Sequence, residues 1–97
     1  MSDKPAGTMQ LQISMDDETA QGSYVNMATV THTETEFVLD FIYVQPQQPR
    51  ARVRSRVITS PRHLKRLLAA MQDSLHRYEQ RYGVVEAAST GPDTPLN

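Results

Sequence analysis

Cysteine and tryptophan are both absent from this sequence of 97 residues. Without cysteine the chain forms neither disulfides nor thiolate metal sites, so a reducing compartment costs it no stability. Its three histidines, His32, His63 and His76, lack metal-ligand spacing such as H-E-x-x-H. No G-x-S-x-G elbow, P-loop or G-x-G-x-x-G pattern is present either. We therefore expect a protein that is not an enzyme and that binds neither a metal nor a cofactor.

Long apolar runs are also missing. No stretch approaches the roughly 18 consecutive apolar residues of a membrane-spanning helix. The first nine residues, MSDKPAGTM, lack the apolar segment of a signal peptide. These two absences favour a cytoplasmic location.

Charge is nearly balanced overall but unevenly distributed. The net charge is −1, yet residues 1–49 carry one lysine and seven acids, whereas residues 50–97 carry nine Lys/Arg and four acids. A chain of this length buries only roughly 60 to 65% of its unfolded surface when it folds alone. Further burial, against a protein partner or within a homodimer, is therefore favoured.

Hydrophobic periodicity predicts an α+β fold: a four-stranded antiparallel sheet, a meander, followed by one long C-terminal amphipathic helix. A single domain at 9–83 is expected between a disordered leader at 1–8 and a disordered tail at 84–97. The predicted strands are residues 9–15, 23–31, 36–44 and 50–59.

Three consecutive acids, Asp16, Asp17 and Glu18, follow the first predicted strand. Adjacent side chains point apart, which disfavours a cation site or an acid/base pair. Acids are common at the start of a helix, where they complement its dipole. We predict a connection with one helical turn, and Gly22 is suited to its exit.

The C-terminal helix has the clearest signals in the sequence. Ser60 is a good N-cap, Pro61 suits the first helical position and Gly83 suits the stop. We expect an apolar stripe to lie against the sheet and to contribute most of the stability. The stripe consists of Leu64, Leu67, Leu68, Met71, Leu75, Tyr78 and Tyr82.

The third and fourth predicted strands form a hairpin. If Tyr43 faces Ala51, Asp40 faces Arg54, and a slip of two residues pairs Asp40 with Arg56 without exchanging the faces. One face, directed at the helix and the core, holds Phe37, Leu39, Phe41, Tyr43, Val53 and Val57. The other is mixed basic and apolar, with Val38, Asp40, Ile42, Val44 and the arginines.

This second face, together with the start of the helix, is the predicted partner-binding site. A run from residue 50 to 66 contains no acid, and cations in the first turn of a helix oppose its dipole, which often marks a functional site. Free backbone N–H groups behind Ser60 also suit an anion. The alternative is a solvated strand edge whose charges discourage aggregation. The candidate residues are Val38, Asp40, Ile42, Arg50, Arg52, Arg54, Arg56, Arg62, His63, Lys65 and Arg66.

Two other functions stay open for the same surface. Nucleic-acid binding is the first alternative, although the isoelectric point of about 6.3 and the absence of tryptophan disfavour it. The second is a homodimeric structural module that uses the face of Val38, Ile42 and Val44.

Short patterns carry a family resemblance. They are Tyr24-x-Asn26, Glu36-Phe37-x-Leu39-Asp40-Phe41, Ser55-Arg56-Val57-x-Thr59-Ser60-Pro61 and Lys65-Arg66-Leu67 with the later Tyr78-Glu79. Over residues 11–83 the chain resembles a small bacterial domain family of unknown function that includes the polarity protein RomX. Its size and order of elements are similar to those of the RomX type.

The resemblance implies a regulatory or adaptor protein. A protein of the RomX type works with a response regulator on a Ras-like GTPase in cell polarity or motility, and it stimulates guanine-nucleotide exchange. Such a protein acts by binding one state of the GTPase better than the other. The family pattern contains no catalytic motif and assigns no exchange residues.

Overall fold

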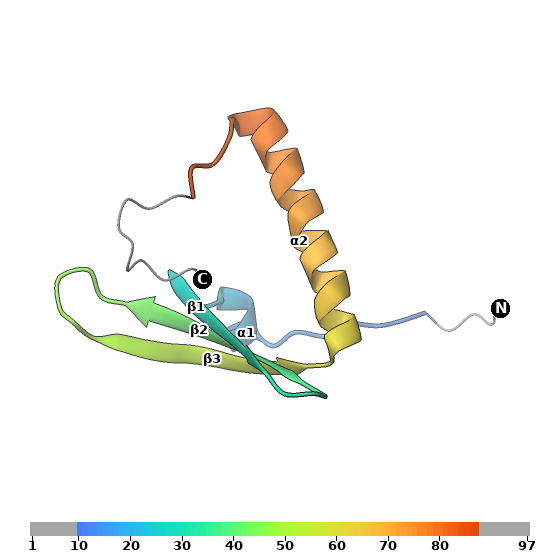
Figure 1. Ribbon diagram of the computed structural model, residues 1–97, viewed down its shortest axis with the longest axis horizontal. Coiled ribbons are helices and arrows are strands. Elements are labelled where there is room, and N and C mark those ends of the chain that lie inside the picture. The colour runs from blue at the N-terminus through green and yellow to red at the C-terminus, as the bar shows by residue number, and fades with distance from the viewer. Residues whose placement is uncertain (1–9, 88–97) are drawn as a thin grey trace.

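The computed structural model describes residues 10–87 (Figure 1). In chain order it contains helix α1 (Asp17–Gln21), strands β1 (Met27–His32), β2 (Phe37–Val44) and β3 (Ala51–Thr59), and helix α2 (Pro61–Tyr82). The predicted leader at 1–8 and residues 88–97 of the predicted tail lie outside the described residues. No helix in the described part of the chain is both long enough and apolar enough to cross a membrane.

Within residues 10–87 the sheet has three antiparallel strands in the order β1-β2-β3. The prediction of a four-stranded sheet is therefore wrong, although the α+β class and the C-terminal helix are as expected. Residues 10–15 of the predicted first strand have no regular secondary structure, and Leu11 and Ile13 are 86% and 82% exposed. Alternation describes side chains alone, whereas a strand also needs a neighbouring edge with which to pair its backbone.

Helix α1 is the single turn that the acidic stretch predicts. The carboxylate of Asp16 caps it by accepting a hydrogen bond from the Thr19 N–H at 2.8 Å. This bond stabilises the charged form and lowers the pKa of Asp16. The helix stops at Gly22, whose φ of 77° is accessible to glycine at little cost.

Strand β1 begins later than the sequence predicts, and a side chain takes over the pairing at its start. Asn26 lies opposite the end of β2, where its amide donates to the Val44 carbonyl at 3.0 Å and accepts from the Val44 N–H at 2.8 Å. The amide group thus replaces a backbone pair. Side-chain closure of this kind explains why an asparagine stands next to a strand that it would ordinarily weaken.

From Phe37 to Phe41, strand β2 pairs with β3 in the alternative register, which is displaced by two residues from the pairing of Tyr43 with Ala51. Leu39 pairs with Val57 and Asp40 with Arg56, which is the two-residue slip. The register then shifts between Phe41 and Ile42, so that Ile42 pairs with Val53. Such an irregularity adds a residue to one strand and moves its following side chains to the other face. The expected facing is wrong beyond this point, because Val53 now shares the face of Ile42 and not that of Leu39.

Helix α2 follows β3 with one residue between them. Ser60 is extended, at φ −82° and ψ 157°, as expected before a proline, and its hydroxyl accepts from the His63 N–H at 3.1 Å. The helix ends at Gly83, as the sequence predicts. It does not lie across the sheet, however: it rises away from the end of β3, and its contacts with the strands are few (Figure 1).

The core is correspondingly small. Among the described residues only Leu39 and Ile42 are buried, each 7% exposed. Leu64 and Leu67, near the base of α2, are half-buried, whereas five further members of the apolar stripe are 49 to 65% exposed. The prediction that this stripe is covered by the sheet of its own chain is thus wrong for most of its length. The exposed members are Leu68, Met71, Leu75, Tyr78 and Tyr82.

Candidate partner-binding surface

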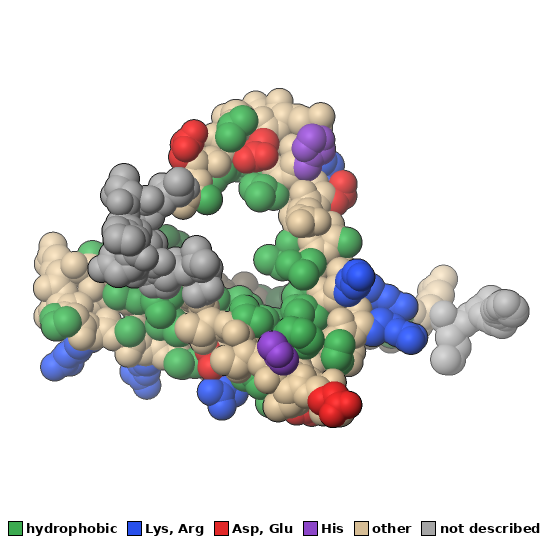
Figure 2. All heavy atoms as spheres, viewed as in Figure 1, with side chains coloured by type: hydrophobic (Ala, Val, Ile, Leu, Met, Phe, Trp, Pro, Cys, Tyr) green, Lys and Arg blue, Asp and Glu red, His purple; other side chains and the backbone are tan. Residues whose placement is uncertain are grey.

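Strand β3 carries a row of arginines along an edge of the sheet. It pairs with β2 on one side and has no strand on its other side within residues 10–87. Arg52, Arg54 and Arg56 lie in the strand and Arg50 directly precedes it, and all four side chains are exposed. Figure 2 shows Lys and Arg side chains projecting from the side of the sheet that faces away from α2. An unpaired backbone edge and a dense positive charge therefore coincide.

One arginine of the row is held by an internal partner. The Arg56 guanidinium donates to both carboxylate oxygens of Asp40, at 2.7 and 2.9 Å. This bidentate bond lowers the pKa of Asp40 and raises that of Arg56. The Asp40 side chain is 13% exposed and that of Arg56 is 64% exposed. The ion pair therefore holds Arg56, the last arginine of the row, against the sheet. Within the described residues no carboxylate pairs with Arg50, Arg52 or Arg54.

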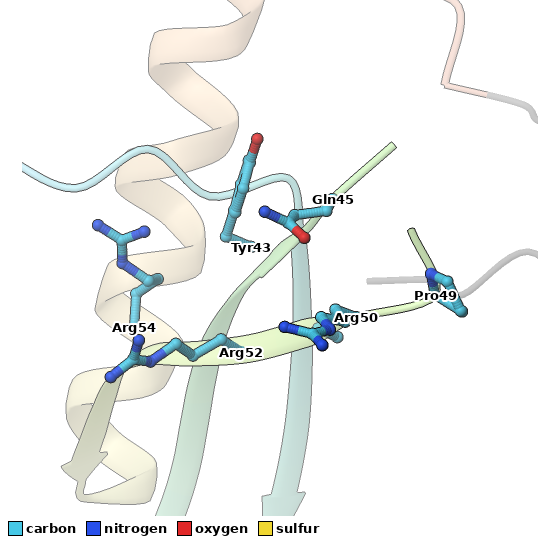
Figure 3. Close-up of a pocket in the computed structure, with 7 residues that line it drawn as sticks. Tyr43, Gln45, Pro49, Arg50, Arg52 and Arg54 are labelled. Carbon is cyan, nitrogen blue, oxygen red and sulfur yellow. The ribbon is translucent and has the colours of Figure 1, made fainter. Parts of the chain in front are cut away.

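The other three arginines border a shallow pocket at the turn end of the hairpin, beside the loop that joins β2 to β3 (Figure 3). Arg50, Arg52 and Arg54 line it from β3, and Tyr43 and Gln45 line it from β2 and the loop that follows. The register shift contributes here, because it pairs Arg52 with Tyr43. Guanidinium groups beside a tyrosine hydroxyl and an amide offer donors suited to a carboxylate or another planar anion.

The remaining basic candidates form a second group at the start of α2. Arg62, Lys65 and Arg66 line a shallow depression with Pro61, and Figure 2 shows Lys and Arg side chains at the base of that helix. All three, and His63, are exposed. The structure thus divides the predicted basic surface into a strand group and a helix group, separated by Ser60.

The apolar candidates of the second face are less available to a partner. Val38 and Asp40 are half-buried, and Ile42 is one of the two buried residues of the sheet. Ile42 pairs with Met27 of β1 on one side and with Val53 of β3 on the other. Arg56 pairs with Asp40 and shares this face, whereas Arg52, beyond the register shift, pairs with Tyr43 and lies on the opposite face. The predicted grouping of the arginines with Val38, Asp40 and Ile42 is therefore wrong for Arg52.

Sequence reasoning missed two features of the surface. The first is the Asn26 closure, for which no period in the sequence gives a signal. The second is the exposure of the α2 stripe, whose amphipathic pattern predicts a covered face without saying which chain covers it. No group of three or more potential metal-ligating side chains occurs in the described part of the chain.

Comparison with known families identifies the class of the chain. Residues 1–87 match the model of a family described as a protein of unknown function, DUF3467. The match spans most of the sequence, so the chain belongs to this family. No significantly similar protein was found among the curated proteins, and none among the solved structures.

Proposed function

We propose that this chain is a non-enzymatic adaptor or regulatory protein that binds an acidic segment of a protein partner along β3. The supporting observation is the coincidence of a free strand edge with Arg50, Arg52 and Arg54, which have no carboxylate partner among the described residues. It acts in the bacterial cytoplasm and uses no cofactor.

Strand addition is the recognition mode that fits this edge. An extended peptide pairs its backbone with an exposed strand and gains specificity from every second side chain. The exposed arginines spaced along β3 favour acidic residues at matching positions of the peptide. The same charges disfavour pairing between two copies of β3, because like charges opposite each other are destabilising.

The resemblance to the RomX type supports a more specific version of this function. In that version the partners are a Ras-like GTPase and a response regulator, and binding stimulates guanine-nucleotide exchange in cell polarity or motility. The protein needs no catalytic group for such a task, since it shifts the equilibrium of the GTPase by its different affinities for the two states.

Two measurements test the specific version. Pull-down with the cognate GTPase and response regulator should recover both partners, and adding the protein should accelerate release of a fluorescent nucleotide from the GTPase. Absence of binding together with unchanged release removes the GTPase assignment. The broader proposal of an acidic partner survives that result and needs the following variants.

The double variant Arg52→Glu/Arg54→Glu tests the surface itself. It reverses the charge of the pocket and leaves the Asp40–Arg56 pair in place, so the circular dichroism spectrum should be unchanged while partner binding is lost. The matched control is Arg77→Glu/Arg81→Glu, which makes the same change in net charge on α2. Equal loss of binding in both variants contradicts a specific role for β3.

Nucleic acid is the competing occupant of the same arginines. Its binding predicts an affinity that falls steeply with salt, because Lys and Arg contacts release counterions from phosphates. A mobility-shift titration with single- and double-stranded oligonucleotides at low salt decides between the two. A stable complex that the double variant abolishes replaces the protein partner with a nucleic acid.

A further inference from the structure

The concave side of the molecule presents two apolar surfaces to each other across an open hollow. Figure 2 shows hydrophobic side chains gathered on the inner side of α2 and on the side of the sheet that faces it. Tyr43, labelled in Figure 3, projects to the side on which α2 rises, and Leu39 has the same parity on β2. Val30 and Val57 pair with Leu39 and share its face, and they are 51% and 41% exposed.

The joint between β3 and α2 prevents the chain from closing this hollow itself. Ser60 is the single residue between the two elements, and Pro61 fixes its own φ and keeps Ser60 extended. The hydroxyl of Ser60 is also engaged, as the cap of the helix. A helix that folded back on its own sheet would need a longer connection, and within residues 10–87 no other element covers its outer half.

From this geometry we infer that a second copy of the chain fills the hollow, with α2 of each copy lying against the sheet and α2 of the other. One two-fold contact then covers both apolar surfaces of both copies, because an isologous interface presents the same patch twice. This contact differs from the backbone edge of β3, although it adjoins the arginine pocket, because Tyr43 lines that pocket too.

Dimensions match such an exchange. The 22 residues of α2 span roughly 33 Å and the nine residues of β3 roughly 30 Å, so one helix covers the length of the sheet. The half-exposed apolar side chains of α2 and of this sheet face offer on the order of 700 Å² per chain, which approaches the roughly 800 Å² that each partner of a standard interface buries.

Charge also selects a second copy as the occupant. The outer half of α2, residues 71–82, carries Asp73 and Glu79 together with Arg77 and Arg81, and Asp73 and Arg77 pair with each other at 2.8 Å. Two such helices do not repel each other. On this half of α2 an acidic or basic partner would find no excess of the opposite charge, in contrast to the arginine row.

Sedimentation and thermal unfolding of the full chain test the inference without any variant. The chain should sediment as a dimer at micromolar concentration, and its Tm should rise with concentration, because dissociation accompanies unfolding of a dimer. A monomer at every concentration up to the high micromolar range, with a constant Tm, overturns the proposal.

A charge on the stripe locates the interface. Leu75→Glu should convert the dimer to a monomer, whereas Gln80→Glu, which introduces the same group on the opposite side of α2, should leave it dimeric. A dimer unchanged by Leu75→Glu contradicts an interface on this stripe. If Leu75→Glu unfolds the chain, crosslinking decides instead.

The absence of cysteine makes crosslinking simple to read. Two single-cysteine variants, Leu75→Cys in α2 and Val57→Cys in β3, are mixed and treated with a short bismaleimide. A crosslinked species that contains one copy of each is expected when α2 lies on the sheet of the other copy. Only random background crosslinking in the mixture, equal to that of Gln80→Cys with Val57→Cys, overturns the arrangement.

Discussion

The sheet and α2 differ in how completely each is satisfied within one chain. The strands pair along their length except at the register shift after Phe41, Asn26 closes the end of β2, and the two buried side chains of the described residues lie in β2. Helix α2 is well capped at both ends, yet most of its apolar stripe is exposed. Local sequence signals therefore determine where the helix begins and ends, whereas packing within the described part of the chain leaves most of its apolar stripe uncovered. We call the sheet, β1 to β3 (residues 27–59), the platform and α2 (Pro61–Tyr82) the arm. The contrast indicates that the platform is stabilised within one chain and that the arm offers its apolar stripe to a second molecule.

The largest expected effect comes from the platform. Leu39→Ala removes a buried side chain, and replacing a buried leucine by alanine costs about 2 to 5 kcal/mol. Chemical denaturation monitored by circular dichroism measures the loss. The comparison fails if Leu39→Ala costs no more than an exposed substitution such as Val84→Ala.

The cost in stability of the same kind of truncation in α2 should depend on protein concentration. Leu68→Ala removes a side chain that is half exposed in one chain, so its cost should be below about 1 kcal/mol for a monomer and about 2 kcal/mol or more where a second copy buries it. Denaturation at low and high protein concentration separates the two values. An equally small cost at every concentration indicates that nothing covers the arm.

The next largest effect is expected at Ser60, the residue that joins β3 to α2. Ser60→Ala removes the hydroxyl that accepts from the His63 N–H, and loss of an N-cap costs about 1 kcal/mol. Hydrogen exchange should show faster opening of the first turn of α2 with unchanged protection of β2. Uniformly faster exchange in both elements means that arm and platform unfold as one unit.

Acid dependence gives the smallest effect. The pKa of Asp40 is lowered in the folded chain, so its ion pair adds stability above the ordinary value of 3.8 and loses it as the pH falls through and below that value. Asp40→Asn removes this contribution. The variant should show a flatter dependence of unfolding free energy on pH in that acidic range. An unchanged slope assigns the acid sensitivity to other carboxyl groups, such as that of Asp16.

Local patterns predicted most elements of the fold. Helix α2 begins and ends where Ser60, Pro61 and Gly83 indicate, and β2 and β3 match their predicted ranges to within one residue at each end. These features depend on nearest neighbours and on capping chemistry, which a sequence displays directly. The arginine row was visible for the same reason.

Long-range relations were not predictable in the same way. The prediction of the first strand, at residues 9–15, was wrong because the alternation of Leu11, Ile13 and Met15 carries no information about a backbone partner. The register shift moved Val53 to the face of Ile42, since one extra residue reverses every later side chain of a strand. The exposure of α2 depends on the direction in which it leaves β3, which amphipathicity does not encode.

The single-residue joint at Ser60 also makes α2 a lever. Because the helix is roughly 33 Å long, a rotation of about 10° at its base displaces its far end by roughly 6 Å. Strand addition changes the twist of an edge strand. Because one residue separates β3 from α2, a change in β3 is transmitted to the base of the helix. A peptide seated on the arginines should therefore reorient the far end of the arm, and a label at Tyr82 would report occupancy of an edge that it never touches.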